Sequence, residues 1–483
     1  MSLVVLCERS LDGAEFFDTV DDDWLNGLPN EHQADTRRLR DLPARIASRD
    51  AVVAVIGLGY VGLPLLMAAG AEGFNLIGVD ADGAKISSLE GGRSYIADIG
   101  DADLEVLKGA AFTSDQHILS RADVILVAVP TPLRDGTPDL SLIETAVANI
   151  AATLRPGQLV ILESTTYPGT TQDLVLPMLE SSGLVAGEDF GLAYSPERID
   201  PGGGWSFRRT PKIVAGVTPA ETELAAGFYS TMVDRVVKTS SPREAEMAKL
   251  IENTFRQVNI ALVNELATIA PAIGVDIWES LEAAATKPFG YMPFWPGPGV
   301  GGHCIAIDPT YLSWKVEQRL GFGVGFIEHA RSVNNRMPGF VTSRIADTLN
   351  EIGQSLQGAR VMVIGLTYKA GVNDVRESPA ISVLGRLIEA GALCDYHDPY
   401  VPSTLVGGRR KTDRPRIGTA LHAEALEMRS VELDDDLLAR ADCVVILTAH
   451  PEIDYERVIS KSALVFDAVG VTRLQRHDHV VVL

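Results

Sequence analysis

Cysteine is scarce in this sequence, and that scarcity limits the classes of protein to which the chain can belong. The chain has four cysteines, Cys7, Cys304, Cys394 and Cys443, which are widely spaced and form no C-x-x-C pair. Neither a zinc site nor a disulfide framework is therefore expected, and no metal is predicted. Such cysteine usage is typical of a reducing compartment, so we predict a cytoplasmic location.

Long apolar runs and an excess of positive charge are also missing. No stretch approaches the roughly 18 apolar residues that a membrane span requires, and the apolar run near the start is too short for a signal peptide. The net charge of −22 disfavours non-specific binding to nucleic acid or to an anionic membrane. We therefore expect neither as a partner, and an anionic ligand would need a locally positive site.

The composition that remains is that of a globular protein with more than one domain. Hydrophobic residues make up 46% of the chain and charged residues 22%. A chain of 483 residues is too long for one hydrophobic core, so two or three domains are expected. Residues 1–50, acidic and then basic, are interpreted as an N-terminal extension of unknown role with at most one or two helices.

Apolar strands alternate with helix-like segments from residue 51 and again from residue 359. This alternation predicts parallel α/β units in both regions. Between them lies a long amphipathic run. Ser241 and Pro242 are start signals for a helix, and Pro271 and Gly274 are stop signals. A helix of about 28 residues would span roughly 40 Å. It could join domains and form a dimer seam, or it could be a buried core helix.

The predicted fold class is therefore α/β, with two Rossmann-like doubly wound domains joined by a long central helix. We place the first Rossmann-like domain at 51–238 and a central helical domain with the cysteine-bearing loop at 239–345. The second Rossmann-like domain is placed at 346–483.

A glycine-rich turn, GLGYVG, follows the first strand and opens a helix. Its glycines permit a tight turn and close approach of a pyrophosphate to the backbone. Asp80 ends the next strand, 18 residues after the last glycine. A carboxylate there can accept a hydrogen bond from a ribose 2′-hydroxyl and would repel a 2′-phosphate, so NAD is predicted rather than NADP. The turn comprises Gly57, Leu58, Gly59, Tyr60, Val61 and Gly62.

Residues with hydroxyl side chains directly follow two further predicted strands. Thr131 follows the apolar run VILVAVP, and Ser164 and Thr165 follow QLVILE. Doubly wound sheets bind ligands at the carboxyl ends of their strands, so these side chains are expected beside the nicotinamide. The alternative is that they are polar strand ends without a ligand.

Charged and amide side chains of the middle region are further candidates. Glu197 and Arg198 lie in a loop after an apolar strand, where a surface ion pair is the alternative interpretation. Lys249 and Asn253 are four residues apart on the long helix and so share one face. Their apolar neighbours favour a partly buried lysine over a solvated helix face.

Cys304 ends the glycine-rich stretch PGPGVGGHC, and Asp308 follows four residues later. A reactive thiolate needs exposure and either amide donors or a positive neighbour, and a glycine-rich loop supplies amides. A buried, inert cysteine is the alternative. Lys369 and Arg376, in the stretch YKAGVNDVRESP, offer positive charge for a phosphate; two solvated cations are the alternative.

Taken together and in this order, the motifs resemble the UDP-glucose/GDP-mannose dehydrogenase family from about residue 51 to residue 475. The matching stretches are GLGYVG, VPTPL, STTYPGT, SPER, KLIEN, GPGVGGHC and YKAGVNDVRESP. The stretches SPERIDPG and FWPGPGVGGHCIAIDPTYLSWK are most similar to the bacterial branch that oxidises UDP-N-acetylhexosamines, UDP-N-acetylglucosamine above all.

The resemblance implies a four-electron oxidation of a sugar C6 hydroxyl to a carboxylate with NAD as the cofactor. NAD would bind in 51–238 and the UDP-sugar in 346–483, in a homodimer that makes precursors of surface polysaccharide. The best match is UDP-N-acetylglucosamine, and the alternatives are UDP-N-acetylmannosamine, UDP-N-acetylgalactosamine and UDP-glucose. A non-catalytic regulator that binds nucleotide sugars is a remote alternative.

The resemblance also implies residue roles. Cys304 would capture the C6 aldehyde as a thiohemiacetal, which a second oxidation turns into a thioester, and Lys249 and Asn253 would stabilise the developing oxyanion. Asp308 and Thr165 would position water or relay protons. Lys85 would join Asp80 at the adenosine ribose, Arg376 would reach the cofactor, and Glu197 would serve in thioester hydrolysis. Substrate contacts are implied for Glu197, Arg198, Lys249, Asn253, Trp295, Gly299, Gly301 and Lys369, with Arg473 as a further candidate.

Overall fold

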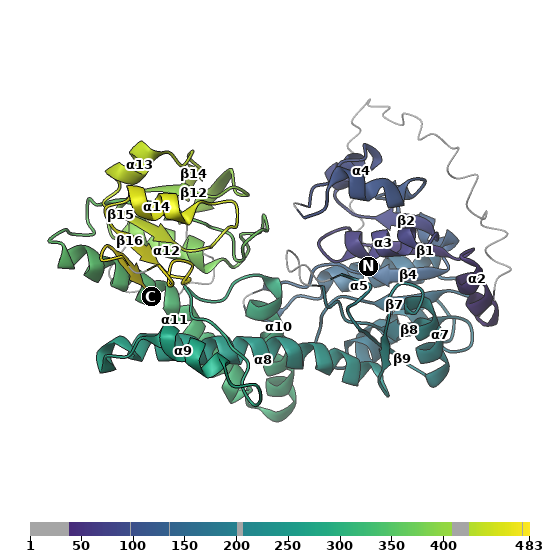
Figure 1. The fold of residues 1–483 in the computed structure, drawn as a ribbon. Coiled ribbons are helices and arrows are strands. Elements are labelled where there is room, and N and C mark those ends of the chain that lie inside the picture. The colour runs from purple at the N-terminus through teal and green to yellow at the C-terminus, as the bar shows by residue number, and fades with distance from the viewer. Residues whose placement is uncertain (1–37, 97, 135, 200–205, 408–424, 476) are drawn as a thin grey trace, which may run out of the picture.

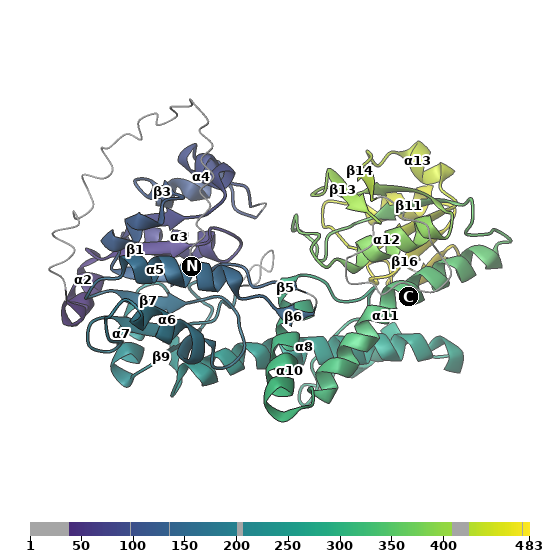
Figure 2. The ribbon, with the colours of Figure 1, turned by 180° about the vertical axis from the view of Figure 1, so that it is seen from behind.

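The computed structural model describes residues 38–96, 98–134, 136–199, 206–407, 425–475 and 477–483. Two α/β domains stand side by side, and helix α8 (Pro242–Ile269) runs beneath both of them (Figures 1 and 2). In the described part of the chain, no helix is long and apolar enough to cross a membrane.

The N-terminal domain is built on an eight-stranded sheet in the order β10-β9-β8-β7-β4-β1-β2-β3. Neighbouring strands from β3 through β8 pair in parallel, whereas β9 pairs with β8 in the antiparallel sense. The chain reaches β9 without a crossover helix in the described part of that connection, so the parallel pattern predicted from the sequence ends at β8. The strands are β1 (Val52–Ile56), β2 (Asn75–Val79), β3 (Ala111–Thr113), β4 (Val124–Val127), β7 (Leu159–Leu162), β8 (Gly191–Tyr194), β9 (Lys212–Gly216) and β10 (Val236–Lys238).

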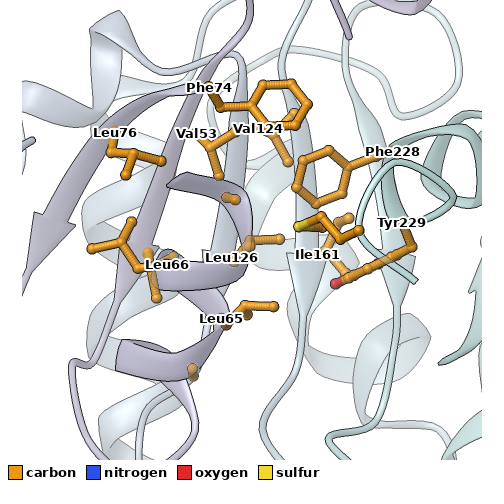
Figure 3. Packing of buried hydrophobic residues seen from close by; sticks show 14 of the residues in the cluster. Val53, Leu65, Leu66, Phe74, Leu76, Val124, Leu126, Ile161, Phe228 and Tyr229 are labelled. Carbon is orange, nitrogen blue, oxygen red and sulfur yellow. The ribbon is translucent and has the colours of Figure 1, made fainter. Parts of the chain in front are cut away.

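Helices cover both faces of this sheet, as a doubly wound domain requires. On one face, Leu65 and Leu66 of α3 pack with strand residues and with Phe228 and Tyr229 of α7 (Figure 3). A second cluster fills the other face. The helices are α3 (Gly62–Ala71), α4 (Gly83–Glu90), α5 (Ser141–Thr153), α6 (Leu176–Glu180) and α7 (Pro219–Tyr229).

The end of the predicted N-terminal extension is part of this domain. Helix α2 (Leu42–Ser48) packs against α7 and buries Leu42 and Ile46 in the same core as α3. Arg49, the residue that follows α2, donates to the carbonyl of Glu72 at 3.2 Å. The first 37 residues lie outside the described residues.

The central helix α8 begins and ends where its sequence signals predict. The Ser241 hydroxyl accepts a hydrogen bond from the Arg243 amide at 3.3 Å, and Pro242 opens the helix, which is 28 residues long. Gly274, beyond its end, has a left-handed φ of 73°. The other central helices are α9 (Ile277–Ala285), α10 (His303–Leu320) and α11 (Gly325–Glu351), and α10 and α11 both pack against α8.

The C-terminal domain has a five-stranded parallel sheet in the order β12-β11-β15-β16-β17, with an apolar cluster on each face. This second Rossmann-like sheet, with the first sheet and α8, confirms the predicted fold class. The strands are β11 (Arg360–Ile364), β12 (Leu393–His397), β15 (Cys443–Ile446), β16 (Val465–Asp467) and β17 (Val480–Val482). The helices are α12 (Pro379–Glu389), α13 (Asp435–Arg440) and α14 (Tyr455–Lys461). Two further strand pairs lie outside the main sheets: β13 (Ser403–Val406) with β14 (Leu426–Arg429), and β5 (Leu133–Arg134) with β6 (Thr137–Pro138).

Candidate active site

The GLGYVG turn has the geometry of a dinucleotide site. Gly57 has a left-handed φ of 92°, and a Cβ added there would lie 2.7 Å from the Ala128 carbonyl oxygen. A Cβ on Gly62 would lie 1.8 Å from the Gly57 oxygen, so only glycine lets α3 approach β1 this closely. Gly59, between them, faces open space. Backbone amides of Leu58 to Val61 precede the N-terminus of α3, where a pyrophosphate is stabilised.

Asp80 directly follows β2, and hydrogen bonds hold its carboxylate in place. Its oxygens accept hydrogen bonds from the Leu58 amide at 2.8 Å and from the Asp82 amide at 2.9 Å. Lys85 donates to the same carboxylate at 2.9 Å, so the two residues predicted to serve the ribose form one ion pair. These residues fit an adenosine ribose of NAD, because a fixed carboxylate accepts from its hydroxyls.

The hydroxyl residues predicted beside the nicotinamide lie at the ends of β4 and β7, which are neighbours in the sheet. Ser164 donates through Oγ to the Val129 carbonyl at 2.7 Å and is buried. Thr131 is also buried, and its carbonyl accepts a hydrogen bond from the Tyr311 hydroxyl of α10. Thr165 is half-buried. The Tyr311 bond therefore ties the cysteine-bearing helix to the NAD-binding domain.

Cys304 lies in the first turn of α10 rather than in the glycine-rich loop itself. The side chain is exposed, yet desolvation by the surrounding protein, followed by the charge of Asp308, raises the pKa of the thiol above its ordinary value. Lys249, Arg256 and Arg376 oppose this shift and lower the pKa. A neighbourhood of three cations is therefore available to stabilise the thiolate.

Asp308 lies one turn further along α10 and on the same face as Cys304. It is buried, its Oδ2 accepts from the Asn253 side chain at 2.6 Å, and its Oδ1 has no hydrogen-bond partner among the described residues. Burial raises the pKa of Asp308 to about 7, although Lys249 and Asn253 pull it down. Asp308 can therefore both accept and release a proton near neutral pH.

A proline directly follows Asp308 and leaves a gap in the hydrogen bonds of α10. Pro309 has no amide proton, so the carbonyl of Ile305 lacks its usual helical partner. The Gln257 side chain of α8 donates to that carbonyl at 3.2 Å. The turn that carries Cys304 and Asp308 is thus fastened to α8.

Lys249 and Asn253 are both buried on the face of α8 that meets this turn. The Lys249 ammonium donates to the main-chain carbonyl of Glu197 at 2.5 Å. The Glu197 carboxylate accepts from the amides of Arg198, at 2.5 Å, and Ile199. Arg198 itself is engaged with Glu252 at 2.7 Å. Lys249, Asn253, Asp308 and Cys304 thus come together from two helices, with the Glu197 loop behind them.

The glycine-rich loop before Cys304 packs closely against the C-terminal domain. A Cβ on Gly301 would lie 2.8 Å from the Glu377 carbonyl, and one on Gly302 would lie 2.7 Å from the ring of Tyr368. Gly302 also donates through its amide to the Arg376 carbonyl at 3.0 Å. Gly299 has a φ of 137°. These glycines therefore allow the close approach of two domains, and their contact with substrate stays a prediction.

Arg376 lies where the two Rossmann-like domains meet. It pairs with Asp374 at 2.6 Å, and its guanidinium lies 6.0 Å from the ring centre of Tyr60 in the GLGYVG turn. The Tyr60 hydroxyl donates to the side chain of Asn373. Lys369 belongs to the same segment, and its carbonyl accepts from Thr367 at 2.8 Å. The predicted cofactor contact of Arg376 is consistent with this position.

The candidates Trp295 and Arg473 form a separate stack with Trp278. Trp295 lies parallel to Trp278 with ring centres 5.9 Å apart, and the Arg473 guanidinium is 5.3 Å from the Trp295 ring. Arg473 also pairs with Glu282 at 2.8 Å. No described contact joins this stack to Cys304 or Lys249, so a substrate role for Trp295 and Arg473 stays a prediction.

Residues that sequence reasoning missed support both domains. Asp398 directly follows β12 and accepts from the Leu366 amide at 2.6 Å, just as Asp80 accepts from the Leu58 amide. The signal for this similarity was the sequence VIGL, which occurs in both domains. The buried His450 contacts Asp398 at 3.1 Å. A second missed group, Glu163, Lys212 and Tyr229, lies behind Glu197 and had no signal in the local sequence.

A nucleotide-binding Rossmann domain and a second Rossmann-like domain meet at the helix that carries the solvent-accessible Cys304, an arrangement that suits a nucleotide-sugar dehydrogenase. Comparison with known proteins gives the family: the chain belongs to the UDP-glucose/GDP-mannose dehydrogenase family, whose NAD binding, central and UDP binding domain models match residues 51–233, 243–336 and 362–474. The cofactor is therefore NAD, as the sequence predicted.

Relatives with different substrate names are similar to this chain. The chain is 39% identical over 357 residues to a UDP-N-acetyl-D-glucosamine 6-dehydrogenase of Pseudomonas aeruginosa, a match that covers 73% of this chain and 84% of the relative. It is 34% identical to a UDP-N-acetyl-D-mannosamine dehydrogenase of Pyrococcus horikoshii, over 83% of this chain and 90% of the relative. A solved structure of the Pyrococcus horikoshii UDP-N-acetylmannosamine dehydrogenase has a TM-score of 0.76 at 32% identity and covers 89% of this chain and 98% of its own.

Proposed function

We propose that the chain oxidises the C6 hydroxyl of a UDP-N-acetylhexosamine to a carboxylate with two NAD, and that UDP-N-acetylglucosamine is its substrate. The observation that carries the proposal is the group of Cys304, Asp308, Lys249 and Asn253 at the junction of the domains. The Pseudomonas aeruginosa relative supports this sugar. UDP-N-acetylmannosamine is the second candidate, supported by the solved Pyrococcus horikoshii structure.

The first half of the reaction forms a covalent adduct on Cys304. When bound, NAD accepts a hydride from C6 in each oxidation. Asp308, with a pKa of about 7, takes the hydroxyl proton, directly or through a water held by Thr165. The Cys304 sulfur then adds to the C6 aldehyde to give a thiohemiacetal. Lys249 and Asn253 donate to the oxygen on which negative charge develops.

The second half releases the acid from the enzyme. Oxidation of the thiohemiacetal gives a thioester on Cys304, and a water molecule adds to its carbonyl carbon. Glu197 accepts the proton of that water, the carbon–sulfur bond breaks, and Cys304 leaves as a thiolate. Division of the reaction into covalent steps keeps the aldehyde from escaping.

The stoichiometry of the reaction tests the proposal. We expect purified protein to form two NADH for each UDP-N-acetylglucosamine consumed, measured by NADH absorbance against product quantified by mass spectrometry. The same assay with the mannosamine, galactosamine and glucose analogues ranks the alternatives. One NADH per sugar would contradict the thioester route, and nucleotide-sugar binding without NADH would support the regulator.

We further propose that two copies of the chain associate through α8. Four large apolar side chains are exposed along this helix at spacings of four, seven and seven residues: Ile251, Phe255, Leu262 and Ile269, with exposed fractions of 55%, 47%, 53% and 49%. Such spacing places them on one stripe of the helix surface. A contiguous apolar stripe on a soluble chain is a typical subunit interface.

A lysine in this stripe should separate the subunits. We expect Leu262→Lys to elute from size exclusion with light scattering at the mass of one chain, and the unaltered protein at twice that mass. Leu393→Lys, at an exposed leucine on the edge strand β12, is the control and should leave the mass unchanged. A Leu262→Lys protein that keeps the double mass would place the interface elsewhere.

A further inference from the structure

A buried lysine lies behind the Glu197 loop and donates three hydrogen bonds to groups around it. Lys212 is the first residue of β9 and is 3% exposed. Its ammonium donates to Glu163 Oε2 at 2.6 Å, to the Pro196 carbonyl at 3.2 Å and to Glu197 Oε2 at 3.5 Å. The second oxygen of Glu163 accepts from the hydroxyl of Tyr229 at the end of α7. One lysine therefore faces two buried carboxylates.

The charges in this group make Lys212 a permanent cation. Burial alone would lower the pKa of Lys212, but Glu163 and Glu197 outweigh it, and the pKa is raised. Burial raises the pKa of Glu163 to about 7 despite the neighbouring lysine. Burial and the charge of Glu163 raise the pKa of Tyr229, which therefore remains a hydrogen-bond donor. The positive charge is thus shared between Glu163 and Glu197.

The position of this group indicates more than a contribution to folding. A buried ion pair is a weak source of stability, because the loss of hydration offsets the attraction between the charges. Glu163 directly precedes Ser164 and Thr165, and Glu197 joins Lys212 on one side to Lys249 on the other through its carbonyl. Lys212 is thus one contact behind a residue that the proposed mechanism uses.

We propose that Lys212 is a positioning residue that orients the Glu197 carboxylate for hydrolysis of the Cys304 thioester. The inference rests on the proposed function. In that step water adds to the thioester carbon, Glu197 takes the water proton, and Cys304 departs with the electrons of the carbon–sulfur bond. Without the Lys212 ammonium, Glu197 Oε2 loses the donor that orients it, so hydrolysis slows and the thioester accumulates.

The experiment compares two variants that differ only in the lysine. Glu163→Gln keeps the Lys212 cation for Glu197, whereas Lys212→Met with Glu163→Gln removes the cation without leaving Glu163 as an orphan charge. With UDP-N-acetylglucosamine and NAD, we expect the double variant to release two NADH per active site in a burst. Steady turnover should then be at least about tenfold slower. Intact-mass spectra of the quenched protein should show the acyl adduct on Cys304.

Controls separate positioning from folding. Glu163→Gln should show no burst, and Lys212→Arg should restore most of the steady rate because it restores the charge. Glu221→Gln removes another buried carboxylate of this domain, which caps α7 and accepts from the Leu192 amide at 2.9 Å, and it should show no burst.

The outcomes distinguish the inference from the function on which it rests. A double variant with unchanged turnover, or one in which the first NADH slows as much as steady turnover, would overturn the role of Lys212. A burst in Glu163→Gln would do the same. An unaltered protein that forms no NADH with any of the four UDP-sugars would overturn the proposed function itself.

Discussion

Replacement of Cys304 by serine is expected to lower turnover at least about a thousandfold while NAD binding survives. A serine hydroxyl at this position is un-ionised at neutral pH and is a poor nucleophile toward an aldehyde. The cations near the sulfur can stabilise a thiolate, whereas the pKa of a serine hydroxyl is too high for them to produce an alkoxide. The NADH assay measures turnover, and a fluorescence titration with NAD measures binding at the GLGYVG turn.

Cys394→Ser provides the matched control for this experiment. Cys394 lies on β12, is half-buried and unpaired, and has a pKa raised to about 12, mainly by burial. It should therefore be inert, and its replacement should leave turnover unchanged. Full activity of Cys304→Ser would show that the cysteine of α10 is structural and that another group carries the reaction.

Asp308→Asn is expected to lower turnover about a hundredfold and at the same time to make the protein more stable at alkaline pH. Asparagine preserves the size of the side chain and can still accept from Asn253, but it cannot take a proton from the substrate. It also carries no charge, so the cost of a buried and incompletely paired carboxylate disappears. Activity and stability therefore change in opposite directions.

The pH dependence of this gain has a defined sign. In the unfolded chain an aspartate loses its proton near pH 3.8, whereas Asp308 in the fold keeps its proton to about pH 7. Between these values the folded protein binds more protons, so the stability of the unaltered protein falls as the pH rises, and the full cost is present above about pH 7.

Denaturant unfolding at several pH values measures the difference between the two proteins. We expect Asp308→Asn to gain roughly 2–4 kcal/mol near pH 8, and the gain to vanish toward about pH 4. Asp347→Asn, on an exposed face of α11, should show no such dependence. Equal stability of Asp308→Asn and the unaltered protein at both pH values would mean that Asp308 is ionised without cost.

Local signals predicted much of the fold, because they act within a few residues. Ser241 and Pro242 begin α8, and Gly62 meets a steric limit set by Gly57 within the same turn. The reversal at β9 was not predictable in this way. It depends on how the chain between β8 and β9 packs, which no short stretch records.

The candidate site also contains features that local sequence predicts and features that depend on contacts between distant residues. The pairing of Asp80 with Lys85 follows from five residues of helix-start geometry. Glu163 and Lys212 are 49 residues apart in the sequence. They meet because the sheet places β7 and β9 on the two sides of β8. The sequence did not predict that Cys304 lies in a helix, because Pro309 and the preceding glycines are typical of a loop. The helix forms here because contacts with α8 stabilise it.

The gap at Pro309 means that the proposed catalytic motif cannot be transferred by itself. Cys304 and Asp308 lie one turn apart, and the Ile305 carbonyl, which Pro309 leaves without its helical partner, accepts instead from the Gln257 side chain of a different helix. Grafting GHCIAIDP alone onto another scaffold would import an unsatisfied carbonyl along with the proposed nucleophile. A designer who wishes to transfer this chemistry therefore has to move a pair of crossing helices as one unit.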